Sequence, residues 1–244
     1  MRAGVLKGQV ARDLLPWRLG IMFNWKQVAA GQRTSPPQKM DALSSRKGLV
    51  KMDYLIKGVI LHWTASSYNL TPNVLKHYNF VIDQFAKVHD GLHPLAHQTP
   101  PLNSGKYAAH TRRHNSYQAG IGLLGMHGAK EKPFSYGKYP ITAIQFMAAV
   151  KLTATICIDH GITVTPQTVL THAEVQDNLG IKQRGKWDIT NLPWNSSIIG
   201  ATAVGSHYRN LVRVEMDRRL TKPTQSPWAA LFSAIAAKFG GKKT

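Results

Sequence analysis

The sequence predicts an α/β fold in which short apolar strands alternate with helices. Three observations predict it: an unbroken apolar segment at residues 55–62, a strongly capped helical segment at 142–160, and shorter apolar segments between and after them. Strands interleaved with helices are typical of a layered fold built around one sheet. The composition agrees, because 43% of the 244 residues are hydrophobic and only 18% are charged. Such a chain can bury a sizeable core.

The predicted strands are short segments that are either continuously apolar or alternate between apolar and polar residues. They are residues 55–62, 78–83, 120–124 and 169–171. Between the first two, residues 71–77 read as a short helix, with Thr71 as N-cap and Pro72 at the first helical position.

The clearest helix spans residues 142–160. Thr142 and Gln145 have the spacing of a capping box, and Gly161 supplies a stop. The last strand then leads directly into His172.

We divide the chain into three parts. Residues 1–51 form a basic N-terminal extension with poor periodicity, for which we expect loose order. Residues 52–194 form the central domain, and residues 195–244 form a basic helical tail. The tail has a predicted helix at 206–220 and a second after Pro227. Five large apolar residues share one face of that second helix: Trp228, Leu231, Phe232, Ile235 and Phe239.

The charge is strongly positive, with 31 Lys and Arg against 12 Asp and Glu, a formal +19. Such a field favours anionic partners, including nucleic acid, membrane phosphates, lipopolysaccharide and wall polymers. No helix-turn-helix, zinc-finger or RRM motif is present, so no specific nucleic acid is predicted. The apolar face of the tail predicts either docking on the domain or contact with an anionic membrane.

Cys157 is the single cysteine, which excludes an intramolecular disulfide and fits synthesis in a reducing compartment. No apolar run approaches the ~18 residues of a membrane span. Charges at Arg12, Asp13 and Arg18 interrupt any signal-peptide core. We therefore expect synthesis in the cytoplasm, without a signal peptide or transmembrane helix.

Three polar residues stand at or beside predicted strand ends: His62, His172 and Asp188. Two neutral imidazoles and a carboxylate suit a tetrahedral zinc site that leaves one position for water. Spacing alone leaves structural roles open, because the chain has 11 histidines. A His-Glu-x-x-His motif is absent, which argues against a metalloprotease of that class.

Five short motifs, in order, resemble the type 2 N-acetylmuramoyl-L-alanine amidases, the family shared with peptidoglycan recognition proteins and phage lysozyme-type amidases. They are Val-Ile-Leu-His-Trp-Thr-Ala-Ser at 59–66, Tyr-Asn-Phe-Val-Ile-Asp at 78–83, Ala-His to His-Asn at 109–115 followed by Gly-Ile-Gly at 120–122, Leu-Thr-His-Ala-Glu at 170–174, and Gly-Lys-Trp-Asp at 185–188. The resemblance runs from residue 54 to 189. It implies a central mixed sheet flanked by helices, and it makes residues 52–194 a zinc amidase domain.

The resemblance assigns roles residue by residue. Zn²⁺ would be held by His62, His172 and Asp188. Lys186 would stabilise the oxyanion of the tetrahedral intermediate. Tyr78 would orient or deprotonate the attacking water. Ile189-Thr190 replaces the family's usual Pro-Gly after the third ligand, so Asp177 is kept as the alternative ligand.

One departure bears on the mechanism. Some bacterial members carry a glutamate as general base shortly after the Ile-Gly pair, where this chain has Leu123-Leu124. Phage members also lack that glutamate and rely on the tyrosine, which supports Tyr78. Four further residues are predicted to line the substrate groove: His110, Arg112, His114 and Asn115. Arginine can pair with the carboxylates of the peptide stems.

The leading hypothesis is therefore an amidase that cuts the bond between N-acetylmuramic acid and L-alanine in peptidoglycan. We expect a monomeric phage endolysin that lyses a Gram-negative host from the periplasm. A non-catalytic peptidoglycan-binding module is the first alternative, although such modules lose a zinc ligand and here Asp188 and Lys186 are both present. A basic nucleic-acid- or polymerase-binding protein is the second.

Overall fold

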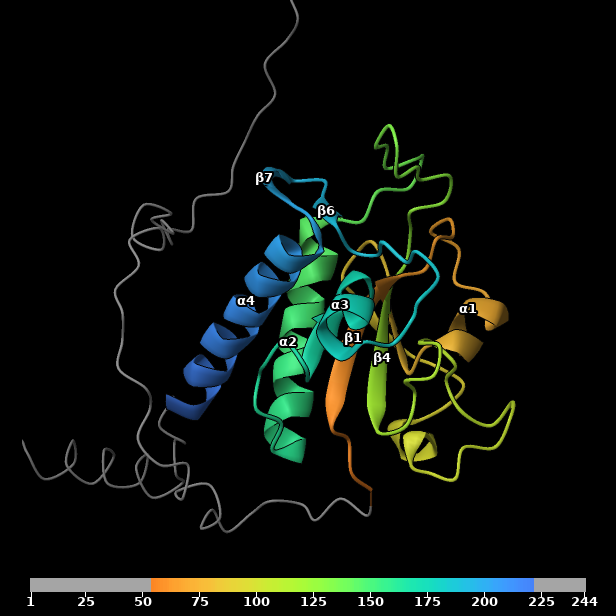
Figure 1. Ribbon diagram of the computed structural model, residues 1–244, viewed down its shortest axis with the longest axis vertical. Coiled ribbons are helices and arrows are strands. Elements are labelled where there is room, and N and C mark those ends of the chain that lie inside the picture. Colours follow the sequence, from red (N-terminus) through yellow and green to blue (C-terminus); the bar gives the residue numbers. More distant parts are fainter. Residues whose placement is uncertain (1–53, 222–244) are drawn as a thin grey trace, which may run out of the picture. The chain divides into compact units, whose positions relative to one another are not determined.

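The computed structural model describes residues 54–221, which are drawn in colour in Figure 1. The predictions for residues 1–51 and for the apolar face after Pro227 lie outside the described residues. Within the described range, no helix is both long and apolar enough to cross a membrane.

A five-stranded sheet forms the centre of the domain, with strand order β3-β2-β4-β1-β5. The strands are β1 (Gly58–Trp63), β2 (Phe80–Ile82), β3 (Val88–Asp90), β4 (Gln118–Leu123) and β5 (Val169–Thr171). β1 runs parallel to β4 and β5, β4 is parallel to β2, and only β3 is antiparallel to its neighbour. The predicted α/β fold with a mixed central sheet is confirmed. The edge strand β3 was not predicted, because three residues are too few to show a period.

The helices cover both faces of this sheet (Figure 1). They are α1 (Pro72–His77), α2 (Ala143–His160), α3 (Val175–Leu179) and α4 (Ala201–Thr221), with short 3₁₀ helices at Leu95–Gln98 and His172–Glu174. Every residue of β1 and of β4 is buried, as expected for parallel strands covered on both faces. Alternate β1 residues therefore face opposite layers: Val59 and Leu61 join the core under α2 and α4, whereas Ile60 packs with Val175 of α3.

The predicted capping of α2 is present. The Thr142 hydroxyl accepts a hydrogen bond from the Gln145 backbone N–H, and the Gln145 side chain accepts one from the Thr142 N–H. Gln145 is buried, and its Nε2 also donates to the carbonyls of Ile82 and Leu124. This side chain therefore fastens the start of α2 to the sheet.

The first part of the predicted tail packs on the core. A small hairpin of β6 (Asn191–Leu192) and β7 (Asn195–Ile199) precedes α4, which lies beside α2. Tyr208 of α4 is fully buried, and its ring lies 5.5 Å from that of Phe146. The helix begins at residue 201, five residues earlier than predicted. The domain boundary at residue 194 stays a prediction.

Candidate metal centre and active site

Two neighbouring parallel strands deliver the two candidate histidine ligands. His62 is the fifth residue of β1, and His172 directly follows β5. The carboxyl ends of parallel neighbours lie at the same edge of a sheet, so the two imidazoles meet there. Asp188 is brought to them by the loop after α3, whose position is fixed by a 2.6 Å hydrogen bond from the Ala173 N–H to the Asp188 carbonyl.

The three side chains form a compact triangle of ligand atoms. His62 Nδ1 lies 3.0 Å from His172 Nδ1, and each of these nitrogens lies 3.2 Å from Asp188 Oδ2. Tetrahedral zinc with bonds of about 2.0–2.1 Å would separate its ligand atoms by roughly 3.3–3.4 Å. The triangle therefore fits one zinc ion closely, and all three residues are buried.

The electrostatics of the triangle suit a cation. Burial, followed by the charge of His172, lowers the pKa of His62 to about 4, so its imidazole is neutral near pH 7. Burial alone would raise the pKa of Asp188, but hydrogen bonds from His172 and His62 outweigh it and lower the pKa to about 2. A neutral imidazole and an ionised carboxylate are the states in which these groups bind metal.

The alternative third ligand does not join the triangle. Asp177 lies on α3 and is exposed, and it is not part of the His62–His172–Asp188 group. The geometry thus favours Asp188 as the residue that completes the site.

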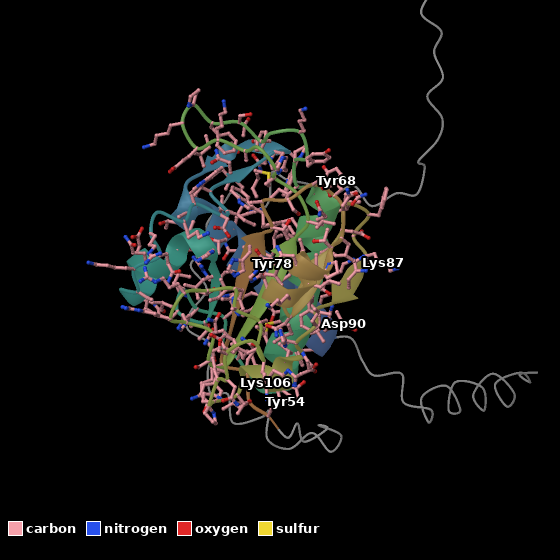
Figure 2. The ribbon with its side chains drawn as sticks, turned by 90° about the vertical axis from the view of Figure 1, so that its right-hand side faces the viewer. Tyr54, Tyr68, Tyr78, Lys87, Asp90 and Lys106 are labelled. Atoms are coloured by element: carbon pink, nitrogen blue, oxygen red, sulfur yellow. The ribbon has the colours of Figure 1, made fainter. Side chains whose placement is uncertain are left out.

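Tyr78 follows α1 and faces the first histidine. Its ring centroid lies 5.4 Å from that of His62, and its hydroxyl donates a 3.4 Å hydrogen bond to the Trp63 carbonyl. Tyr78 lies over the sheet in the middle of the view in Figure 2. Burial, and then the charge of Asp188, raises the pKa of Tyr78, so the phenol keeps its proton. A protonated phenol is better suited to orienting a water than to deprotonating one.

Two glycines of β4 make the space for these side chains. A Cβ on Gly122 would lie 2.9 Å from the Tyr78 ring, and a Cβ on Gly120 would lie 2.4 Å from the His110 ring. Both glycines face the same side of the sheet as His62, because Gly122 pairs with His62 and side chains alternate along a strand. The Gly-Ile-Gly motif is therefore a steric requirement of the site.

Lys186 stands at the mouth of the site. It is exposed and shares the lining of a cavity of ≈ 370 Å³ with Asp188. Trp63 and Trp187 form an aromatic wall of this cavity, with ring centroids 4.7 Å apart in an edge-to-face arrangement. The cavity therefore combines a cation, an aromatic wall and one member of the triangle, Asp188.

The four residues predicted to line the groove divide into two pairs. His110 and Asn115 are buried: His110 lies against His62, and the Asn115 Oδ1 accepts from the Thr111 N–H and so closes the loop between them. Arg112 is exposed, and the nearby positive charge of Arg184 lowers its pKa. His114 is half-buried, and burial lowers its pKa. Substrate contacts for all four stay predictions.

The structure also reveals polar residues that the sequence reasoning missed. Gln183 is buried and contacts His172, and Glu174 forms a buried ion pair with Arg209. The Thr171/Glu174 capping box was a possible signal for Glu174. Nothing in the sequence marks Gln183, since a loop glutamine is ordinarily exposed.

Comparison with known proteins shows to which family the chain belongs. The sequence model of the N-acetylmuramoyl-L-alanine amidase family matches residues 52–188, which is more than half of the chain. The chain therefore belongs to the N-acetylmuramoyl-L-alanine amidase family. A search of curated proteins finds no significant match.

Several solved structures are similar to the chain at low identity. The amidase LysC from Clostridium intestinale URNW is 16% identical, with 58% of this chain and 81% of that chain covered and a TM-score of 0.36. The Ph2119 endolysin from Thermus scotoductus MAT2119 bacteriophage Ph2119 is 14% identical, with 67% and 92% covered and a TM-score of 0.38. The amidase AmiD from E. coli, in complex with anhydro-N-acetylmuramic acid-L-Ala-D-gamma-Glu-L-Lys, is 17% identical, with 52% of each chain covered and a TM-score of 0.35.

Proposed function

We propose that this chain is a zinc-dependent amidase that hydrolyses the bond between N-acetylmuramic acid and L-alanine in peptidoglycan. The observation that carries the proposal is the triangle of His62, His172 and Asp188, whose ligand atoms lie 3.0 and 3.2 Å apart, close to the spacing of roughly 3.3–3.4 Å in tetrahedral zinc sites. Membership of the amidase family supports the same reaction.

The side chains around the triangle supply complementary functions. Zinc, when bound by His62, His172 and Asp188, would acidify a water and polarise the scissile carbonyl. Tyr78 keeps its proton and would hold the water by a hydrogen bond. Lys186 would stabilise the negative charge that develops on the carbonyl oxygen. Hydrolysis adds water oxygen to the lactyl carbonyl carbon, breaks the C–N bond and leaves the proton on the L-alanine nitrogen.

Arginines near the mouth suit the rest of the substrate. Arg112, Arg113 and Arg184 are exposed, and the like charges of Arg184 and Arg113 contribute to the lowered pKa of Arg112. Peptidoglycan stems carry carboxylates, which a guanidinium binds with two parallel hydrogen bonds. We therefore infer that this group contacts the peptide stem, next to the bond that is cut.

A non-catalytic peptidoglycan-binding module is less consistent with this site. Binding alone does not require an ion with an open coordination position, whereas the full triangle with Lys186 at its mouth suits catalysis. The proposed biological setting is a phage endolysin that is made in the host cytoplasm, lyses the host and acts on the periplasmic wall as a monomer. Binding of the basic tail to anionic membrane or lipopolysaccharide stays a prediction.

The decisive experiment identifies the bond that is cut. The purified protein is incubated with soluble muropeptides, with and without a chelator, and the products are analysed by mass spectrometry. We expect separated N-acetylmuramic acid and peptide stems, loss of cleavage with chelator, and recovery on adding Zn²⁺. Cleavage of a glycosidic or peptide bond, or full activity in chelator, would contradict the proposal.

A further inference from the structure

The two candidate histidine ligands are held from behind by buried polar side chains. Both imidazoles turn Nδ1 toward the centre of the triangle, so Nε2 points away from it. His172 Nε2 lies 3.0 Å from Gln183 Oε1, and His62 Nε2 lies 3.2 Å from His110 Nδ1. Gln183 and His110 are 3% and 8% exposed, respectively.

The orientation of Gln183 is fixed by its other partners. Its Nε2 donates to the carbonyl oxygens of Arg112, at 3.0 Å, and Ile181, at 3.2 Å. Rotating the amide by half a turn would place Oε1 against these two acceptors. It would also remove the acceptor that faces His172. Gln183 Oε1 must therefore face His172, and the His172 Nε2 must carry the hydrogen.

The hydrogen bonds behind His62 start from the backbone carbonyl of Gln118. His110 Nε2 lies 3.3 Å from the Gln118 carbonyl oxygen, which can only accept. The hydrogen of a neutral His110 is therefore on Nε2, and its Nδ1 accepts from His62 Nε2–H. His62 is thereby left with a lone pair on Nδ1, directed at the triangle.

The hydrogen bonds behind His62 and those behind His172 meet in one loop. His110 and the Arg112 carbonyl lie two residues apart, so a single turn supports the contacts behind both imidazoles. The Asn115 side chain closes this turn, and Gly120 provides the space in which the His110 ring lies.

We propose that Gln183 and His110 are positioning residues that hold His172 and His62 with Nδ1 toward the metal. The inference rests on the proposed metal site. Their carbonyl and imidazole acceptors fix the tautomer and ring plane of each ligand before the ion binds. Outer partners of ligating histidines characteristically strengthen metal binding by 10–100-fold.

A pair of glutamine variants separates positioning from stability. Gln183→Met keeps the side-chain length but removes the acceptor behind His172. Gln145→Met is the matched control, because Gln145 is also buried and also donates to two carbonyls, but lies at the start of α2. We expect Gln183→Met to weaken Zn²⁺ affinity by roughly 10–100-fold in a chelator competition. Gln145→Met should lower the melting temperature and keep the wild-type affinity.

A histidine series tests the other contact and supplies a spectroscopic signature. His110→Asn keeps an acceptor close to the position of Nδ1, whereas His110→Phe removes it. We expect His110→Phe to weaken Zn²⁺ binding and to change the visible absorption of the Co²⁺-substituted protein, and His110→Asn to restore part of both.

The outcomes distinguish this inference from the proposed function. If the wild type binds Zn²⁺ and cleaves the amide while Gln183→Met and His110→Phe retain full Zn²⁺ affinity, the positioning role is wrong and the proposed function stands. The same conclusion follows if Gln145→Met weakens Zn²⁺ binding as much as Gln183→Met. A wild type that takes up no Zn²⁺ overturns both.

Discussion

Two buried polar clusters lie side by side in this domain, and they differ in how well their hydrogen-bonding groups are satisfied. In the first, Arg209 of α4 donates to both carboxylate oxygens of Glu174, at 2.9 and 3.0 Å, and to the Val169 carbonyl. Glu174 also accepts from the Thr171 N–H at 3.0 Å. Each buried charge therefore has an opposite charge and further hydrogen bonds.

The second cluster consists of His62, His172 and Asp188, and His172 lies two residues before Glu174 in the sequence. It is built differently. The acceptor atoms of His62, His172 and Asp188 converge on one point, and no Lys or Arg side chain within residues 54–221 is hydrogen-bonded to them. Buried charges are normally paired or coordinate metals. We call Glu174 and Arg209 the saturated cluster, and it fastens α4 to the sheet. We call His62, His172 and Asp188 the convergent cluster, and it is suited to hold an ion.

The largest expected effect comes from removing one member of the convergent cluster. His62→Ala and His172→Ala should each reduce bound zinc from about one ion per chain toward zero and abolish turnover, because two ligands cannot retain the ion. Metal content measured on folded protein, together with muropeptide cleavage, checks this. Full zinc content and full activity in either variant would show that the site is assigned wrongly.

The saturated cluster should respond in stability. Arg209→Met leaves the Glu174 carboxylate buried without its counter-ion, and breaking such a pair typically lowers the free energy of unfolding by ~3–5 kcal/mol. Urea denaturation at pH 7 measures the loss. The double variant Arg209→Met/Glu174→Leu should recover a large part of it, and folded Arg209→Met should still bind zinc. A loss of zinc from the folded variant would mean that the two clusters are not separate.

Lys186 tests whether the convergent cluster has a catalytic group beside its ligands. Lys186→Ala should lower kcat by ~10²–10³-fold, as for loss of one oxyanion-stabilising group, while zinc content stays near normal. Tyr78→Phe should also slow turnover and spare the metal. Lys182→Ala is the matched control, because Lys182 is exposed on the same loop and does not line the cavity. Equal rates for both lysine variants would contradict the role.

The smallest effect concerns a third, partly exposed ion cluster. Hydrogen bonds from Arg218 and Arg219 outweigh burial and lower the pKa of Glu215 to about 2. Because the pKa of Glu215 is lower in the folded state than its ordinary value of 4.5, the ionised carboxylate stabilises the fold at pH values above 4.5. This contribution is lost as the pH falls toward 2. Arg218 is 48% exposed, so Glu215→Gln should lower stability by no more than ~1 kcal/mol at pH 7. The difference from wild type should vanish near pH 2 in urea titrations, and a loss as large as that of Arg209→Met would overturn the contrast.

The sequence was informative where structure depends on local chemistry. Apolar runs predicted β1 and β4, and the capping pair Thr142/Gln145 predicted α2, because these patterns depend on neighbours along the chain. The start of α4 was placed too late, since its first turn lacks a charged or amphipathic pattern. Formation of a short edge strand such as β3 depends on hydrogen bonds to its pairing partner, here β2, and not on a pattern in its own three residues.

Sequence patterns were less informative about the site's surroundings. The family motifs named His62, His172 and Asp188, which the structure brings together, but they do not say on which side of a ligand a loop crosses. His110 was expected at the groove, and its contact with substrate stays a prediction. The structure adds that it lies against His62, in space that depends on Gly120. Gln183 is held in part by the Arg112 carbonyl, which lies 71 residues away in the sequence, and no local pattern reports such a contact.

The interior position of β1, between β4 and β5, has a consequence for synthesis of the chain. Its histidine meets partners that follow 110 and 126 residues later, and its two neighbouring strands are both non-local. Contacts of such long sequence separation make folding slow, because large loops must close first. On the ribosome, β1 therefore has no strand partner until β4 has emerged, and its other edge stays unpaired until β5 has emerged. We expect translation rate, and chaperones that shield this strand, to change the yield of folded protein. We expect them to have less effect on the catalytic rate of the molecules that do fold.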